Sequence, residues 1–147
     1  MSLNRIGRYA IVTCFLVLTA CSPRPKEIVY GTDGCHFCRM TIVDAQHAAQ
    51  LVTKKGKVYK FDAIECMINH LKEVDTSEVA VLVCNHYSKP KELIDATQAT
   101  FLVSESIPSP MGEFLTAFKE RKEAENILKD NPGNLYNWQQ IVEVLNH

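Results

Sequence analysis

The sequence predicts an α+β fold built from two tandem ββαβ units, and three observations support this prediction. Residues 47–61 read as a β-hairpin, followed by a helix-periodic segment and then by an apolar run of strand length. The same order of elements returns in the second half of the 147-residue chain. A shift of 57 residues also aligns the two halves, and the matched pairs are Phe61 with Phe118, Asn69 with Asn126, Leu71 with Leu128 and Lys72 with Lys129.

In the first unit, the expected strands cover residues 48–53 and 58–61, and Gly56 can supply the positive φ that the turn between them needs. Asp62 is expected to cap the following helix, because its carboxylate can accept hydrogen bonds from the first free N–H groups. Residues 79–84 are nearly all apolar, which predicts a strand covered on both faces. The helix before that strand has one apolar face, formed by Ile64, Met67, Ile68, Leu71 and Val74.

In the second unit, the expected order is strands at 99–103 and 113–118, a helix at 120–129 and a strand at 135–138. Pro132 and Gly133 end the second helix. A short terminal helix is expected at 141–145. The two units are predicted to cover residues 34–86 and 87–147 of a folded region, 30–147.

The first residues of the chain are typical of a lipoprotein signal peptide, predicted to span residues 1–20. Arg5 and Arg8 precede an apolar run at 9–20 that is too short to cross a bilayer. The run ends in a Leu-Thr-Ala-Cys sequence that resembles a lipobox, so we expect Cys21 to carry the lipid. The alternative is an ordinary cleaved signal with an unrelated cysteine. A lipid on Cys21 would anchor the protein in the cell envelope, facing the periplasm or the exterior.

The chain from Cys21 onward holds 14 Lys or Arg against 17 Asp or Glu, a formal charge of −3. It has no basic stripe, which argues against nucleic acid as a partner. Residues 21–29 contain Pro23 and Pro25 and are expected to form an extended tether. Four cysteines remain in the folded region, where the oxidising compartment permits disulfides, and they are Cys35, Cys38, Cys66 and Cys84.

The stretch Cys35-His36-Phe37-Cys38-Arg39-Met40 is the main candidate for chemistry. Thiolate and thioether sulfur are soft donors that favour copper(I) over hard cations. If the chain is extended from Cys38 onward, Cys38 and Met40 point to the same face, because side chains two apart share a face of a strand. A preceding turn could bring Cys35 to the same point.

Three other interpretations of these cysteines stay open. Cys35 and Cys38 could form a disulfide, and Cys66 could pair with Cys84 in a purely structural lipoprotein adaptor. The Cys-x-x-Cys pair could also serve a periplasmic thiol-disulfide oxidoreductase. Such an enzyme places the pair at the start of a helix, whereas the β-branched residues at 41–43 argue against a helix here. Zinc would need a second close pair of ligands, and Cys66 and Cys84 are too far apart in sequence to be one, although they could still meet in space.

Several motifs taken together resemble the NosL family. They are Cys38-x-Met40-x-Ile42, Gln50, the hairpin segment 56–62, Glu65-Cys66-Met67 and Pro110-Met111-Gly112. The resemblance implies a fold related to that of the organomercurial lyase, copper(I) binding without enzymatic activity, and delivery of copper to apo nitrous oxide reductase for assembly of its copper centres. It also implies the associated membrane transporter as a partner.

Carried over by residue, the resemblance places the family's Cys-x-Met pair on Cys38 and Met40, and its Pro-Met-Gly loop on Met111. The chain departs from the commoner family form at Arg39, where that form has glycine, and in the extra Cys35. A cation at position 39 favours the thiolate form of its neighbour. Whether one or two thiolates bind, and whether a homodimer shares the site, stays open.

Two further residues are reserve candidates for the site. His47 follows Met40 closely, and Cys66 stands one helical turn before His70. The competing interpretation of the helix pair is a buried thiol beside a surface imidazole. Met111 could equally fill a gap at the edge of the core. We expect His36, His47 and His86 to be surface or loop histidines.

Overall fold

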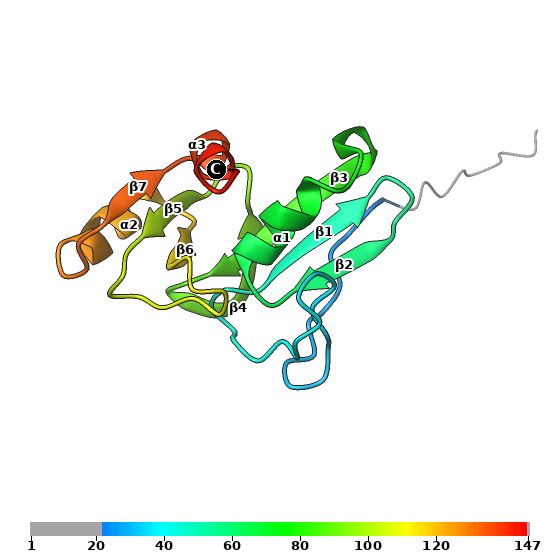
Figure 1. Cartoon of the computed structure of the whole chain (residues 1–147), viewed down its shortest axis with the longest axis horizontal. Coiled ribbons are helices and arrows are strands. Elements are labelled where there is room, and N and C mark those ends of the chain that lie inside the picture. The colour runs from blue at the N-terminus through cyan, green and yellow to red at the C-terminus, as the bar shows by residue number, and fades with distance from the viewer. Residues whose placement is uncertain (1–21, 147) are drawn as a thin grey trace, which may run out of the picture.

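A computed structural model describes residues 22–146, and in this part of the chain the two ββαβ units are present (Figure 1). The predicted signal peptide and the predicted lipidation site at Cys21 lie outside the described residues. The first unit consists of β1 (Ala49–Thr53), β2 (Val58–Phe61), α1 (Ile64–Leu71) and β3 (Val79–His86). The second unit consists of β5 (Thr100–Val103), β6 (Leu115–Phe118), α2 (Arg121–Leu128) and β7 (Asn134–Tyr136). The predicted α+β class is therefore confirmed.

The two units share one topology. Each has its first strand in the middle, so the sheet orders are β2-β1-β3-β4 and β6-β5-β7, with all pairings antiparallel. The bounds of β2 and α1 coincide with those of β6 and α2 after a shift of 57 residues. The 57-residue shift does not align β1 with β5, because the connection from β5 to β6 is longer than the turn from β1 to β2.

The sequence interpretation missed β4 (Lys89–Asp95), which pairs with β3 at the edge of the first sheet. Its Lys-Pro-Lys-Glu start is unlike a buried strand, but an edge strand tolerates proline because one row of its N–H groups needs no partner. The first sheet therefore continues to Asp95, beyond the unit boundary expected between residues 86 and 87.

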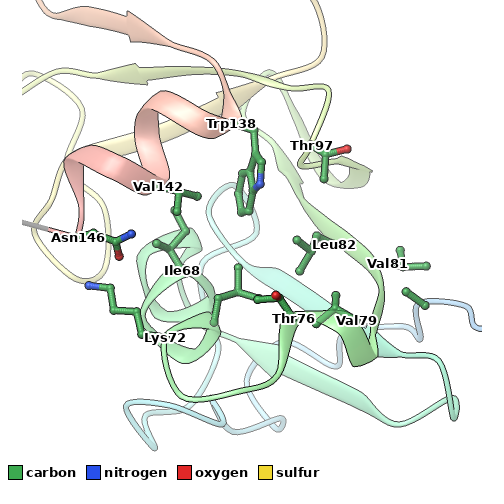
Figure 2. Close-up of a pocket in the computed structure, with 12 residues that line it drawn as sticks. Ile68, Lys72, Thr76, Val79, Val81, Leu82, Thr97, Trp138, Val142 and Asn146 are labelled. Carbon is green, nitrogen blue, oxygen red and sulfur yellow. The ribbon is translucent and has the colours of Figure 1, made fainter.

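The strand β3 is less covered than predicted. The partner β4 reaches only from His86 to Val83, and Ala80 is exposed. A groove of about 490 Å³ lies beside this half of β3, between α1 and α3 (Trp138–Val144), as Figure 2 shows. Trp138 lines the groove as the first residue of α3, so the predicted strand at 135–138 ends at Tyr136.

The start of α1 also differs from the prediction. Ala63, not Asp62, is the N-cap residue, and no side chain caps this helix end. Asp62 is buried instead, and its Oδ1 atom has no hydrogen-bond partner. A short 3₁₀ helix, Thr76–Glu78, follows α1 and leads into β3.

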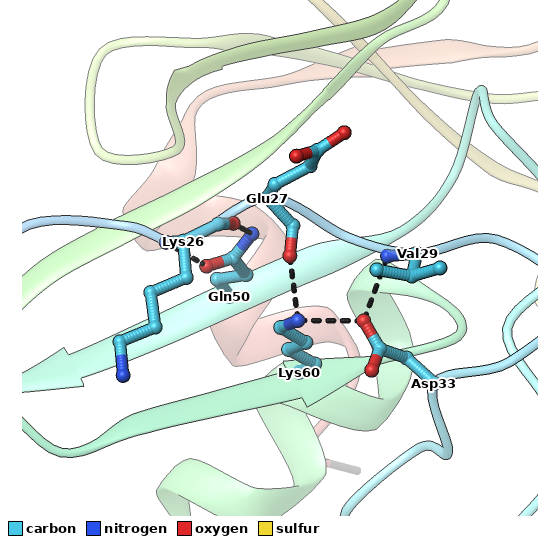
Figure 3. A network of polar contacts seen from close by, with 6 residues as sticks. All are labelled: Lys26, Glu27, Val29, Asp33, Gln50 and Lys60. Carbon is cyan, nitrogen blue, oxygen red and sulfur yellow. Dashed lines mark hydrogen bonds and ion pairs between the residues drawn. The ribbon is translucent and has the colours of Figure 1, made fainter.

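The segment expected to be a free tether is held against the first sheet from Lys26 onward (Figure 3). The side-chain amide of Gln50 bonds the backbone N–H and C=O of Lys26 at 3.0 and 2.6 Å. The ammonium group of Lys60 donates to the carbonyl of Glu27 and to Asp33, the latter at 2.6 Å. Two residues further on, Ile28 is buried in the core.

Within residues 22–146, no helix combines the length and the apolar character that a membrane crossing would require.

Candidate metal centre

A short hairpin positions the first two cysteines. Asp33 and Ile42 are joined by a backbone hydrogen bond of 2.8 Å, and the N–H of Cys35 donates to the carbonyl of Met40 at 2.7 Å. The loop at its tip closes through a bond from the N–H of Arg39 to the carbonyl of Cys35. Because the loop is this tight, Cys35 and Cys38 lie on one side of it, and the N–H of Cys38 donates to the Cys35 sulfur at 3.5 Å.

The third cysteine comes from the first turn of α1. Cys66 is fully buried, and its N–H donates to the carbonyl of the N-cap residue Ala63. The backbone N–H of Asp62, just before the helix, donates to the Cys35 sulfur. The hairpin therefore places the Cys35 sulfur near the N-terminal end of α1, where the helix dipole favours negative charge.

The Sγ atoms of Cys35, Cys38 and Cys66 all lie within 4.8 Å of one another. Cys35 is 2% exposed and Cys38 is half-buried. Among residues 22–146 this is the one group of three His, Cys, Asp or Glu side chains close enough to share a metal ion. All four cysteines of the folded region are free thiols, and Cys84 lies apart in the core.

The three thiols have unequal acidity. The pKa of Cys35 is lowered, mainly because the Cys66 thiol donates a hydrogen bond to it, with further donation from the Asp62 N–H. The pKa of Cys66 is raised for the same reason and by burial, and burial raises the pKa of Cys38. Cys35 is therefore the most acidic of the three thiols. A soft cation that displaces the thiol protons would complete a three-sulfur site.

Aromatic rings and imidazoles pack beside the cluster. The rings of His36 and His70 lie 4.9 Å apart, and His36 also packs on Tyr59 at 4.5 Å. The expected surface position of His70 is wrong, since its ring is buried beside Phe61 and its Nε2 atom has no partner. The pKa of His36 is lowered, first by burial and then by nearby cationic groups that include Arg39.

The predicted extended run from Cys38 to Met40 is wrong. Arg39 adopts a φ of 68°, in the left-handed region, and this turns the chain between the two residues. Met40 is consequently 60% exposed, although its backbone N–H donates to the Cys38 sulfur. The same φ gives a physical reason for glycine at this position in the commoner form of the motif, because glycine adopts a positive φ without strain.

The predicted ligand Met111 lies on the long connection between β5 and β6. The Ser109 hydroxyl donates to the Glu65 carboxylate, next to Cys66, and the N–H of Gly112 donates to the carbonyl of Ser109. These contacts hold the loop near the start of α1, and Met111 remains 36% exposed. Met111 is therefore not buried in the core, and the loop that carries it is attached near the start of α1.

The reserve candidate His47 lies elsewhere. It is 3% exposed, with Nδ1 3.0 Å from the Asp44 carboxylate, and it is absent from the three-cysteine group. His47 lies in a turn, as a loop histidine, but it is buried rather than on the surface. The expected surface or loop position of His86 is wrong, because His86 ends β3, is buried and lies 2.7 Å from Glu123 on α2. Cys66, ranked below Met40 from the sequence, is the residue that completes the cluster. Its spacing of four from His70 on one helix was the available signal.

The fold and the cluster define a class of protein: a small α+β domain of two ββαβ units with a buried three-thiol site beside an exposed thioether. The sequence model of NosL matches residues 27–145, and the chain belongs to the NosL family. It is 25% identical over 161 residues to the copper-binding lipoprotein NosL of Stutzerimonas stutzeri, covering 98% of this chain and 85% of that protein.

A solved structure agrees with this membership. The crystal structure of the copper chaperone NosL from Shewanella denitrificans superimposes with a TM-score of 0.70 and 27% sequence identity. The superposition covers 80% of this chain and 94% of that one.

Proposed function

We propose that this chain is a lipid-anchored copper(I) chaperone of the cell envelope, which binds the ion through Cys35, Cys38 and Cys66 and passes it on. The observation that carries the proposal is the approach of these three Sγ atoms to within 4.8 Å of one another. Three sulfur donors in a buried position suit a soft monovalent ion. Relatives named as a copper-binding lipoprotein and a copper chaperone support the choice of copper and of a lipid anchor.

In this proposal Met40 and Met111 act at the edge of the site. Both thioethers are exposed, at 60% and 36%, while Cys35 and Cys66 are buried. The backbone N–H of Met40 donates to the Cys38 sulfur, so one of these thioethers belongs to a residue in contact with a proposed ligand. We assign Met40 and Met111 as ligands during entry and release, with apo nitrous oxide reductase as the recipient and its associated membrane transporter as a further partner.

The structure favours binding over disulfide exchange. A redox-active Cys-x-x-Cys pair needs an exposed nucleophile of low pKa, whereas Cys35 is 2% exposed and burial raises the pKa of Cys38. The third thiol, from Cys66, has no role in a two-cysteine exchange. Binding and ligand displacement, without bond-making chemistry on a substrate, account for all three cysteines.

Anaerobic copper(I) titration against a competing chelator tests the proposal. We expect one tightly bound ion per chain, with affinity lost in Cys35→Ser and Cys38→Ser and unchanged in Cys84→Ala, a core cysteine outside the cluster. Met40→Leu is expected to slow copper release to the chelator more than it weakens binding. Unchanged affinity in both serine variants would overturn the proposal.

A further inference from the structure

A shallow cavity of about 370 Å³ adjoins the cysteine cluster at Cys35. It is lined on the hairpin side by Cys35, His36 and Arg39 and on the β2 side by Lys57, Tyr59 and Lys60. Three of its lining residues are cations, and none is an acid. Cys35 is itself part of this lining, so a molecule that fills the cavity lies directly against a proposed copper ligand.

Two of the three cations are uncompensated. Lys60 is neutralised by Asp33 at 2.6 Å, whereas Arg39 and Lys57 form no ion pair among residues 22–146. Both side chains are exposed. Lys57 is held over the ring of Tyr59, with its Nζ atom 4.5 Å from the ring centroid, so its charge is fixed at the wall of the cavity.

Charge is also distributed unevenly along residues 22–147. Residues 22–60 contain seven Lys or Arg against three Asp or Glu, a formal charge of +4. Residues 61–147 contain seven against fourteen, a charge of −7. The cavity therefore lies in the positively charged part of a sequence whose net charge is negative, and three of the seven cations of residues 22–60 line it.

We propose that the cavity formed by Arg39, Lys57, Tyr59 and Lys60 is the docking surface for an acidic segment of the copper-accepting protein. This inference rests on the proposed copper function and adds the chemistry of the partner. Opposite charges steer an acceptor to the cavity and raise its association rate. An anionic membrane surface fits the charge but offers no soft ligand, whereas the occupant of a cavity lined by Cys35 must exchange ligands with copper.

The transfer step is a ligand exchange without a redox change. Copper stays in the +1 state, and its bonds to the sulfur atoms of the cluster are exchanged for bonds to sulfur atoms of the acceptor. The protons that the acceptor thiols release are taken up by the freed sulfur atoms of Cys38 and Cys66. The cations that line the cavity offset the negative charge that three thiolates leave on the copper-loaded site. An acceptor that carries carboxylates and thiolates can then approach without repulsion.

Transfer of copper to synthetic acceptor peptides tests this proposal. The full chain is placed in vesicles of neutral phospholipid, loaded anaerobically with copper(I), and its copper content is measured first. Peptides with one identical two-cysteine core, flanked by glutamates or by lysines, then receive the copper, which is quantified after rapid separation. At low salt we expect the glutamate-flanked peptide to accept copper about tenfold faster or more, with the difference lost at about 0.5 M salt.

Charge reversal identifies the surface. Lys57→Glu is expected to abolish the preference, while the matched variant Lys122→Glu, an exposed lysine on α2, retains it. A copper-loaded chain with equal rates for both peptides, or a Lys57→Glu variant that keeps the preference, overturns the docking proposal alone. Loss of the preference when the vesicles contain anionic phospholipid assigns the cavity to headgroups and also overturns it. A chain that takes up no copper overturns the proposed function and the docking proposal together.

Discussion

Two fully buried cysteines allow a controlled test of the third ligand. Cys66 and Cys84 are each 0% exposed, but only Cys66 belongs to the three-thiol cluster. Truncation to alanine removes one buried sulfur atom in both cases, which costs about 1 kcal/mol of stability from lost burial. Cys66→Ala also removes the hydrogen bond to the Cys35 sulfur, for which we add about 1 kcal/mol.

The two variants should differ far more in copper affinity than in stability without copper. Loss of an outer-shell group alone lowers metal affinity 10–100-fold, so we expect loss of a direct ligand to weaken binding by at least about 100-fold. At free copper(I) equal to about 100 times the wild-type Kd, binding stabilises the folded state by about 2.7 kcal/mol. In Cys66→Ala the same copper concentration gives only about 0.4 kcal/mol, while Cys84→Ala keeps the full increment.

Urea unfolding under anaerobic conditions, with and without buffered copper(I), measures these increments. The difference between the copper responses of the two variants is the decisive quantity, because their different stabilities without copper cancel in it. Equal copper responses in Cys66→Ala and Cys84→Ala would refute the three-sulfur site.

Three other predictions concern the surroundings of the site. Arg39→Gly relieves the backbone strain of a non-glycine residue at a φ of 68° and should stabilise the protein by about 0.5–1 kcal/mol in urea unfolding. Arg39→Ala removes the charge but keeps the strain, so a gain of the same size in this variant would mean that the charge causes the effect. Asp33→Asn should lower stability at neutral pH by about 0.5–1 kcal/mol, because Lys60 holds the pKa of the Asp33 carboxyl below its usual value in a partly exposed pair. The ion pair stabilises the folded state above the ordinary aspartate pKa, and this stabilisation is lost as pH falls through the lowered pKa of Asp33. The free energies of unfolding of the wild type and Asp33→Asn should therefore become equal in acid. A difference that persists in acid would contradict the ion pair as its cause. Gly133→Ala would place a Cβ atom against the Val103 carbonyl oxygen and should lower the free energy of unfolding by about 1–3 kcal/mol in thermal unfolding. Gly34→Ala, with open space around it, is the control and should change stability by less than about 0.5 kcal/mol. Equal effects of the two substitutions would refute the close packing of Gly133.

The elements with strong local patterns were predictable from the sequence. The bounds of β2 match the predicted strand at 58–61, and α2 lies within the predicted helix at 120–129, because turn chemistry and apolar periodicity are local properties. The strand β4 was missed because Pro90 and the lysines around it are tolerated only at a sheet edge, and edge position is decided by tertiary structure.

The site was predictable only in part, for a similar reason. The pattern Cys35-x-x-Cys38 is visible as a local motif, but the approach of Cys66 depends on a loop and a helix that meet across about 30 residues of chain. Met40 ranked above Cys66 on the assumption of an extended chain, which the left-handed Arg39 breaks. A positive φ at an arginine has no signature in a single sequence, whereas glycine at that position would have indicated it.

X-ray absorption at the copper edge of the copper(I)-loaded chain tests the central claim most directly, because it counts the atoms bound to the metal. We predict three sulfur neighbours in the wild type and in Cys84→Ala, and two in Cys66→Ala. A first shell dominated by nitrogen or oxygen, or a sulfur count that Cys66→Ala leaves unchanged, would contradict the assignment of the metal to these three cysteines.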